Sequence, residues 1–219
     1  MMALLGMPTS QSFSLVSLPL RSPAPVQRTC PIMHLNAAKL DSEAMGRCAS
    51  ALCEAGDEIV AAAAILGENQ CDEEDPARLS AGGCSIANAG RDAEAAAAAL
   101  ADNEWAGACG PLKACAGSLF GAAASLADLC SAGAALGEAG LEIEDASLVL
   151  PATAGPSLTS AGESLASAGG ALGAHAGQMK KGGGVYAQAG ARLFLAGGSL
   201  AAAGEALEQC GVAVEKGGN

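Results

Sequence analysis

A seven-residue motif repeats without interruption between Ala154 and Val214. Each unit places a small residue four positions before a large one, and glycine usually follows the small residue. Spacings of three and four that alternate to give seven lie on one stripe of an α-helix. The small positions are Ala154, Ala161, Ala168, His175, Gly182, Ala189, Ala196, Ala203 and Cys210, and the large ones are Leu158, Leu165, Leu172, Met179, Tyr186, Leu193, Leu200, Leu207 and Val214.

The same spacing of seven occurs upstream of this motif and predicts two more helices. The first covers about residues 42–67. The second begins at Asp75-Pro76, an N-cap residue followed by proline at the first helical position, and ends near residues 102–103. Their stripes consist of Met45, Leu52, Ile59 and Leu66, and of Leu79, Ile86, Ala93 and Leu100.

Residues 111–150 keep the spacing only in part. Gly110-Pro111 is predicted to start the third helix, and Trp105 is predicted to lie in the preceding connection and to close one end of a bundle. Large residues recur every seven positions up to Leu126, but the next one is Leu136, a step of ten. Such a three-residue stammer interrupts a heptad register. The segment is therefore either one long helix or two helices with a break near 131–133.

The last part of the chain is predicted to form a turn over 151–156 and helices over about 157–181 and 185–214, separated by Gly182–Gly184. Short turns make sequential helices antiparallel. The predicted fold is all-α, an antiparallel bundle of five or six Ala/Gly-rich helices with heptad-like seams. Gly197 lies on the small edge of one stripe, where we expect a neighbouring helix to approach closely.

The first forty residues differ in composition from the rest. Residues 1–40 contain five serines, three basic residues, prolines at five positions and no acid, whereas the composition changes abruptly at Asp41. Transit peptides are rich in Ser and Arg and poor in acids. The prolines favour targeting to the plastid, and targeting to the mitochondrion is the alternative. We expect residues 1–40 to be a targeting segment and residues 41–219 to be the helical bundle domain.

The net charge of −12 is unevenly distributed. Residues 1–40 carry +3, and the remainder carries 8 basic and 23 acidic residues, which gives −15. An acidic body without a basic cluster excludes nucleic-acid binding, which requires Lys or Arg against phosphates. The most apolar window, Ala116–Gly137, contains Asp128 and few large apolar residues, which disfavours a membrane-spanning helix.

The nine cysteines include no CxxC pair and no zinc or haem motif. In helical runs cysteine behaves as a small hydrophobic residue, and Cys71 with Cys84 is the best candidate for a disulfide. The chain has two histidines, no GxxxxGK[ST] or GxGxxG loop and no nameable pair of carboxylates. The sequence therefore predicts a protein that is not an enzyme, with no catalytic residue and no metal ligand to name.

His175 is the one residue that departs from the motif, because it occupies a position otherwise held by small side chains. Its neighbours are Ala174, Ala176 and Gly177, which are too small to block a flat macrocycle. His175 is thus a candidate ligand of chlorophyll or haem. The alternative is an ordinary hydrogen-bonded histidine near a helix end.

Apolar residues outside the main stripe suggest what the bundle binds. Phe194, Leu195, Ala201 and Ala202 lie off the stripe of the last helix, and apolar residues on several sides of a helix imply contact with a partner. We expect other protein subunits to bind these apolar small-residue faces. The predicted function is a non-enzymatic scaffold, linker or accessory subunit at the periphery of a plastid photosynthetic membrane complex.

Two other functions compete with this prediction. A coat protein whose helices lie on a lipid surface would need Lys and Arg at the boundary of each apolar face, and these helices mostly lack them. An ice-binding helix would need an 11-residue period, whereas this period is seven.

Overall fold

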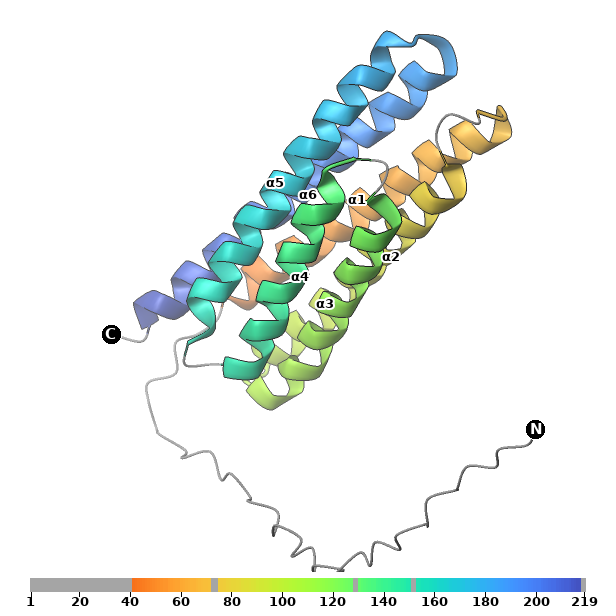
Figure 1. The fold of residues 1–219 in the computed structure, drawn as a ribbon. Helices are drawn as coiled ribbons and strands as arrows, with labels where there is room; N and C mark the ends of the chain where they lie inside the picture. Colours follow the sequence, from red (N-terminus) through yellow and green to blue (C-terminus); the bar gives the residue numbers. More distant parts are fainter. Residues whose placement is uncertain (1–40, 72–74, 128–129, 151–152, 218–219) are drawn as a thin grey trace, which may run out of the picture. The chain divides into compact units, whose positions relative to one another are not determined.

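The computed structural model of the chain describes residues 41–71, 75–127, 130–150 and 153–217. Within these ranges the backbone forms six helices and no strand, which confirms the predicted all-α fold (Figure 1). The predicted targeting segment, residues 1–40, lies outside the described residues. The helices are α1 (Ser42–Glu68), α2 (Pro76–Ala101), α3 (Trp105–Leu126), α4 (Ala132–Val149), α5 (Ala154–Lys181) and α6 (Gly184–Gly217).

Aspartate caps explain where the first two helices begin. The Asp41 carboxylate accepts hydrogen bonds from the backbone N–H groups of Glu43 and Ala44 at 3.1 and 3.0 Å. Asp75 caps α2 in the same way, and Pro76 occupies its first position, as predicted. A side-chain oxygen at this place satisfies N–H groups that have no partner within the helix.

The predicted start of the third helix is wrong. Helix α3 begins at Trp105, and Pro111 lies inside it. Proline removes one backbone hydrogen bond from a helix interior. The turn before Pro111 is nevertheless helical because it buries Ala108 completely and packs Trp105 against the core. Trp105 is therefore the first residue of α3, half-buried, and does not lie in the connection.

Residues 111–150 form two helices, which settles the alternative that the sequence left open. Helix α3 ends at Leu126 and α4 begins at Ala132. Leu126 and Leu136 are both fully buried, and the break between them allows each to face the core despite the ten-residue step. Helix α5 begins at Ala154, earlier than predicted, with Pro156 in its first turn, a place that tolerates proline.

The six helices pack in a ring. Each helix contacts the one before it and the one after it, and α6 returns to contact α1 (Figure 1). Three helical hairpins, α1–α2, α3–α4 and α5–α6, make up this ring. All described residues belong to one compact unit, His34–Asn219. The turn of the α5–α6 hairpin contains Gly183 and Gly184 at φ of 70° and 52°, values that glycine adopts without strain.

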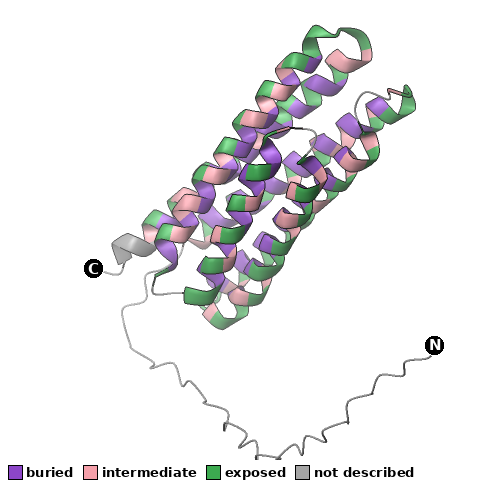
Figure 2. Cartoon of the chain, viewed as in Figure 1, coloured by how far each residue is buried: buried purple, intermediate pink, exposed green. Residues whose placement is uncertain are grey.

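The predicted stripes form the interior of the ring, and the buried positions follow each helix along one side (Figure 2). Most large residues of the motif are fully buried, whereas Tyr186 is half-buried. Alanines and glycines occupy the positions where neighbouring helices meet. The fully buried large residues include Met45, Leu52, Ile59, Leu66, Ile86, Leu112, Leu119, Leu126, Leu136, Leu158 and Leu165.

The α5–α6 seam shows why glycine follows the small residue in the motif. A Cβ atom added to Gly197 would lie 2.7 Å from the carbonyl oxygen of Gly169. One added to Gly162 would lie 2.6 Å from the carbonyl oxygen of Gly204. The two backbones are therefore too close for any side chain, and the close approach predicted at Gly197 is confirmed. Residues 169 and 162 differ by seven, as do 197 and 204, so this contact repeats with the motif.

Candidate interaction surfaces

The predicted pigment ligand, His175, lies on α5 near the end of the helix, between Ala174 and Ala176. Its side chain is half-buried and has an interaction partner within the chain. His175 is thus neither a core residue nor a fully exposed one. Its assignment as a chlorophyll or haem ligand stays a prediction.

The predicted Cys71–Cys84 disulfide is wrong, because both residues are free thiols. Cys71 precedes α2 and packs against the core, with its Sγ atom 3.9 Å from the carbonyl oxygen of Asn69. Cys84 lies more than two turns into α2 on an exposed face. The two thiols are therefore not joined.

Three other cysteines lie inside the ring on three different helices. Burial raises the pKa of the Cys48 thiol on α1 to about 12, and the neighbouring Cys210 contributes. Burial also raises the pKa of Cys210 on α6 to about 12, with the Asp41 carboxylate as a second cause. The pKa of Cys115 on α3 is raised by burial and by Cys48. These thiols are neutral and unreactive at ordinary pH, as expected for packing residues.

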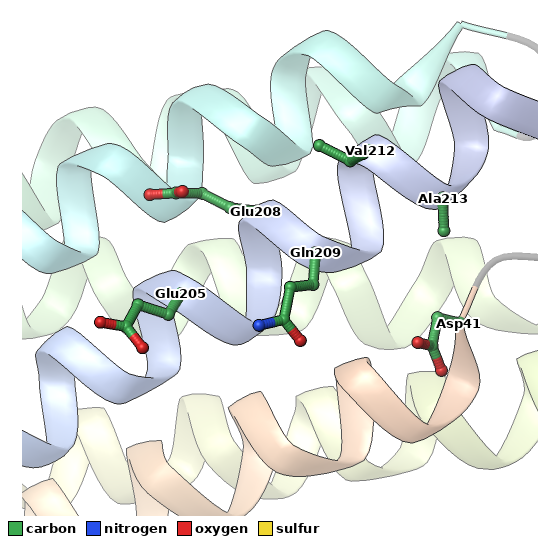
Figure 3. A pocket seen from close by; sticks show the side chains of 6 residues that line it. All are labelled: Asp41, Glu205, Glu208, Gln209, Val212 and Ala213. Atoms are coloured by element: carbon green, nitrogen blue, oxygen red, sulfur yellow. The ribbon is translucent and has the colours of Figure 1, made fainter.

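An open hollow of about 580 Å³ lies beside the C-terminal half of α6, next to the start of α1 (Figure 3). Its lining includes the carboxylates of Asp41, Glu205 and Glu208 together with Gln209 and Val212. A second hollow of about 240 Å³ shares Glu205 and Gln209. Arg47 lines this second hollow, and its Nη2 atom donates a hydrogen bond of 2.8 Å to Gln209 Oε1.

The chemistry of this hollow is that of an acidic surface notch. It contains carboxylates and an amide, but its lining has no nucleophile and no histidine. No group of three His, Cys, Asp or Glu side chains in the described part of the chain could hold a metal ion.

Large apolar side chains are exposed on α4. Leu148 is 71% exposed and Leu141 is 57% exposed. With Glu138 and Asp145 they form a row at helical spacing, which we call the acid–leucine stripe (Glu138, Leu141, Asp145, Leu148). All four residues are exposed, so the stripe is a continuous surface along α4.

A second set of exposed apolar residues lies on α6, as the sequence predicted. Phe194 is 55% exposed and Leu195 is 53% exposed, and Ala202 is exposed about two turns later. Ala201 is only half-buried because it faces the seam, where its N atom would lie 2.8 Å from a Cβ at Gly169. The ammonium of Lys180 lies 4.1 Å from the centre of the Phe194 ring, a cation–π contact between α5 and α6.

The two surfaces carry opposite charge. Residues 114–179, which include all of α4, contain no lysine or arginine. Residues 164–204, which include most of α5 and the first part of α6, contain no aspartate or glutamate but contain Lys180, Lys181 and Arg192. Arg192 donates to both carboxylate oxygens of Glu58 at 3.1 Å and so joins α6 to α1.

The acid–leucine stripe is the surface that sequence reasoning missed. Its signal was present, because Leu141 and Leu148 are seven residues apart and fall outside the Leu136, Ile143 and Leu150 stripe. A second apolar row on a helix whose first row is buried indicates an exposed apolar surface.

The chain matches no protein-family model and no curated protein. None of the helices in the described ranges combines the length and the apolarity needed to cross a membrane.

Proposed function

We propose that this chain is a non-catalytic helical scaffold subunit that binds other protein subunits at the periphery of a plastid photosynthetic membrane complex. The observation that carries this proposal is the acid–leucine stripe of α4. Leu141 and Leu148 place most of their surface in water, which is unfavourable for large apolar side chains. A partner that covers them would remove that cost.

The chemistry of the stripe specifies the partner. Acidic residues alternate with leucines along it, and the whole segment 114–179 has no basic residue. A complementary surface would have an apolar row flanked by lysine or arginine, so that opposite charges meet around a desolvated centre. Anionic lipid would repel the carboxylates, which is why a protein partner is favoured over a lipid-surface coat.

The plastid part of the proposal rests on the composition of residues 1–40, which has the serines, basic residues and prolines of a transit segment and no acid. The ring of helices supports a structural role, because its Ala/Gly seams hold the helices rigidly while the outer faces stay available for contacts.

Native electrophoresis of mildly solubilised cells that produce the tagged full chain tests the proposal. The parent chain should migrate in a complex well above 42.2 kDa, twice the 21.1 kDa of one chain. Leu148→Lys should release it from that complex, since a lysine there would face the basic rim of the partner. Cys84→Lys, which replaces an exposed side chain on α2 outside the acid–leucine stripe, is the matched control and should leave the complex intact.

Two outcomes would refute this function. In the first, the parent chain migrates in native electrophoresis only as a monomer or as a homodimer. In the second, it joins no protein complex and floats with anionic liposomes in a density gradient. The second outcome would favour the lipid-surface coat.

A further inference from the structure

We propose that two copies of this chain associate through the outer face of the α5–α6 hairpin as an antiparallel dimer with two-fold symmetry. This contact goes beyond the binding of other subunits on the acid–leucine stripe and uses a different surface. The face combines exposed positions of α5 and α6, two helices that lie side by side (Figure 1). Its central residues are Gly170 and Ala174 on α5 and Ala191, Leu195, Gly198 and Ala202 on α6.

The outer glycines of this face have no role in packing within the chain. A Cβ atom added to Gly170 or Gly198 would meet nothing within 4 Å, whereas one added to their neighbours Gly169 or Gly197 would collide with the opposite backbone. Glycine weakens a helix compared with alanine. Its use at positions 170 and 198 leaves a smooth surface on which another helix pair can approach as closely as α5 approaches α6.

The charges on α5 identify the occupant as a second copy. Glu163 and Lys181 are both exposed and are 18 residues apart, which is five turns at 3.6 residues per turn, so both point to the same side of the helix. Their separation along the axis is about 27 Å. When α5 of one copy lies antiparallel on α5 of the other, Glu163 of each faces Lys181 of the other. A parallel arrangement would place like charges together.

The apolar residues lie where this symmetry needs them. The point midway between Glu163 and Lys181 is residue 172 of α5. The contact of Gly169 with Gly197 across the seam sets Phe194 and Leu195 of α6 at about the same level. Lys180 covers the Phe194 ring, which leaves Leu195 as the principal free apolar group. Leu195 of the two copies would then meet near the two-fold axis, as an isologous interface requires.

The face is large enough for a stable dimer. Helix α5 has 28 residues and is therefore about 42 Å long at 1.5 Å per residue. Two helices of about 10 Å width give a face of roughly 800 Å², the area that each partner buries in an interface of standard size.

The experiment is to measure the mass of the purified full chain by light scattering after gel filtration and its dissociation constant by sedimentation equilibrium. We expect a dimer of 42.2 kDa, twice the 21.1 kDa of one chain. Leu195→Glu should raise the dissociation constant at least 100-fold, because it brings two carboxylates together near the axis. Leu141→Glu, an exposed leucine of α4, is the matched control and should leave the constant unchanged.

A charge exchange tests the antiparallel orientation. Lys181→Glu should raise the dissociation constant about tenfold, because each new carboxylate faces Glu163 of the other copy. Lys181→Glu combined with Glu163→Lys should restore the parent value. Circular dichroism of each variant verifies that the helices remain folded.

A monomeric parent chain at 100 μM would overturn the dimer, and so would a dimer that survives Leu195→Glu or is lost equally in Leu141→Glu. Failure of the exchange to restore association would overturn the orientation. These results are distinguishable from those for the scaffold function, since a monomeric purified chain that still enters a large native complex refutes only the dimer. A dimer that enters no such complex refutes only the scaffold.

Discussion

The α5–α6 and α3–α4 hairpins differ in the groups that meet where their two helices contact each other. In α5–α6 the motif of seven continues through the turn, and glycines meet the backbone of the opposite helix. In α3–α4 the register is broken between Leu126 and Leu136. A Cβ atom on Gly140 would meet first the ring of Phe120, at 3.0 and 3.1 Å. One seam is made of backbone and the other partly of a side chain.

This difference determines how much change each seam tolerates. A backbone held in a helix cannot move away from a new methyl group without displacing the whole helix. The atoms of a half-buried aromatic ring, in contrast, can shift by a few tenths of an ångström through small changes in the side-chain torsion angles. The α5–α6 seam should therefore be rigid along the motif. The α3–α4 seam should be tolerant at Gly140 but not at Gly133, where a Cβ atom would lie 2.9 Å from the backbone of Ala123 and Ala127.

The largest effect is expected for Gly197→Leu. On helix propensity alone the change should stabilise by about 0.8–1 kcal/mol. The leucine would instead force α5 and α6 apart, because its Cβ would lie 2.7 Å from the carbonyl oxygen of Gly169. We expect the free energy of unfolding, measured by chemical denaturation, to fall by about 3 kcal/mol or more.

Gly198→Leu is the matched control for this prediction, because a Cβ at that position meets nothing within 4 Å. It should leave stability unchanged or raise it at protein concentrations where the chain is monomeric. Equal losses for the two variants would mean that the seam of α5–α6 is not formed by residue 197.

A smaller effect is expected for each buried thiol from a rise in pH to 10.5, about 2 kcal/mol. It links the two hairpins because Cys115 belongs to α3 and Cys210 to α6. The pKa of Cys210 rises from its ordinary 9.0 to about 12, mainly through burial. Above pH 9 the unfolded chain loses this proton while the folded chain keeps it, so stability falls as pH rises from 9 towards 12. The slope is about 1.4 kcal/mol for each pH unit and each thiol.

Denaturation midpoints measured between pH 8 and pH 10.5 test this slope. Cys210→Ala and Cys115→Ala should each make the decline shallower, whereas alanine in place of the exposed Cys84 should not. A parent chain whose stability is constant up to pH 10.5 would show that these thiols are not buried in solution.

The regular parts of the fold were predictable because the period alone decides them. The stripe from Leu158 to Leu207 specified α5, α6 and their buried side, and Asp75-Pro76 specified the start of α2. The start of α3 was not predictable from local chemistry, since proline at 111 suggests a helix start and only the burial of Ala108 shows otherwise. The break after Leu126 was visible, but its resolution into two helices depends on both leucines facing one core.

The candidate surfaces were predictable only in part. Phe194 and Leu195 fall outside the main stripe of a helix that was recognised from its period, and both are exposed. The leucines of α4 were harder to interpret because they sit beside the interrupted register. Gly197 lies in the seam and Gly198 faces outward, and this difference depends on where the neighbouring helix lies. The seven-residue pattern specifies which residues share one side of a helix, but it does not specify which side the neighbouring helix contacts.

The smallest effect is expected for Gly140→Ala, which measures the tolerance of the α3–α4 seam directly. Alanine gains about 0.8–1 kcal/mol of helix propensity over glycine. The new methyl must displace the Phe120 ring and lies 3.2 Å from the carbonyl oxygen of Ala116, a contact that a small shift relieves. The two effects nearly cancel, so the free energy of unfolding should change by less than about 1 kcal/mol.

In a Phe120→Leu background the ring is absent, and the same change should become stabilising. Denaturation of the four chains of this double-mutant cycle gives the coupling between residues 120 and 140. A loss as large as that of Gly197→Ala, measured alongside, would mean that the two seams are equally rigid and that the contrast between the hairpins does not hold.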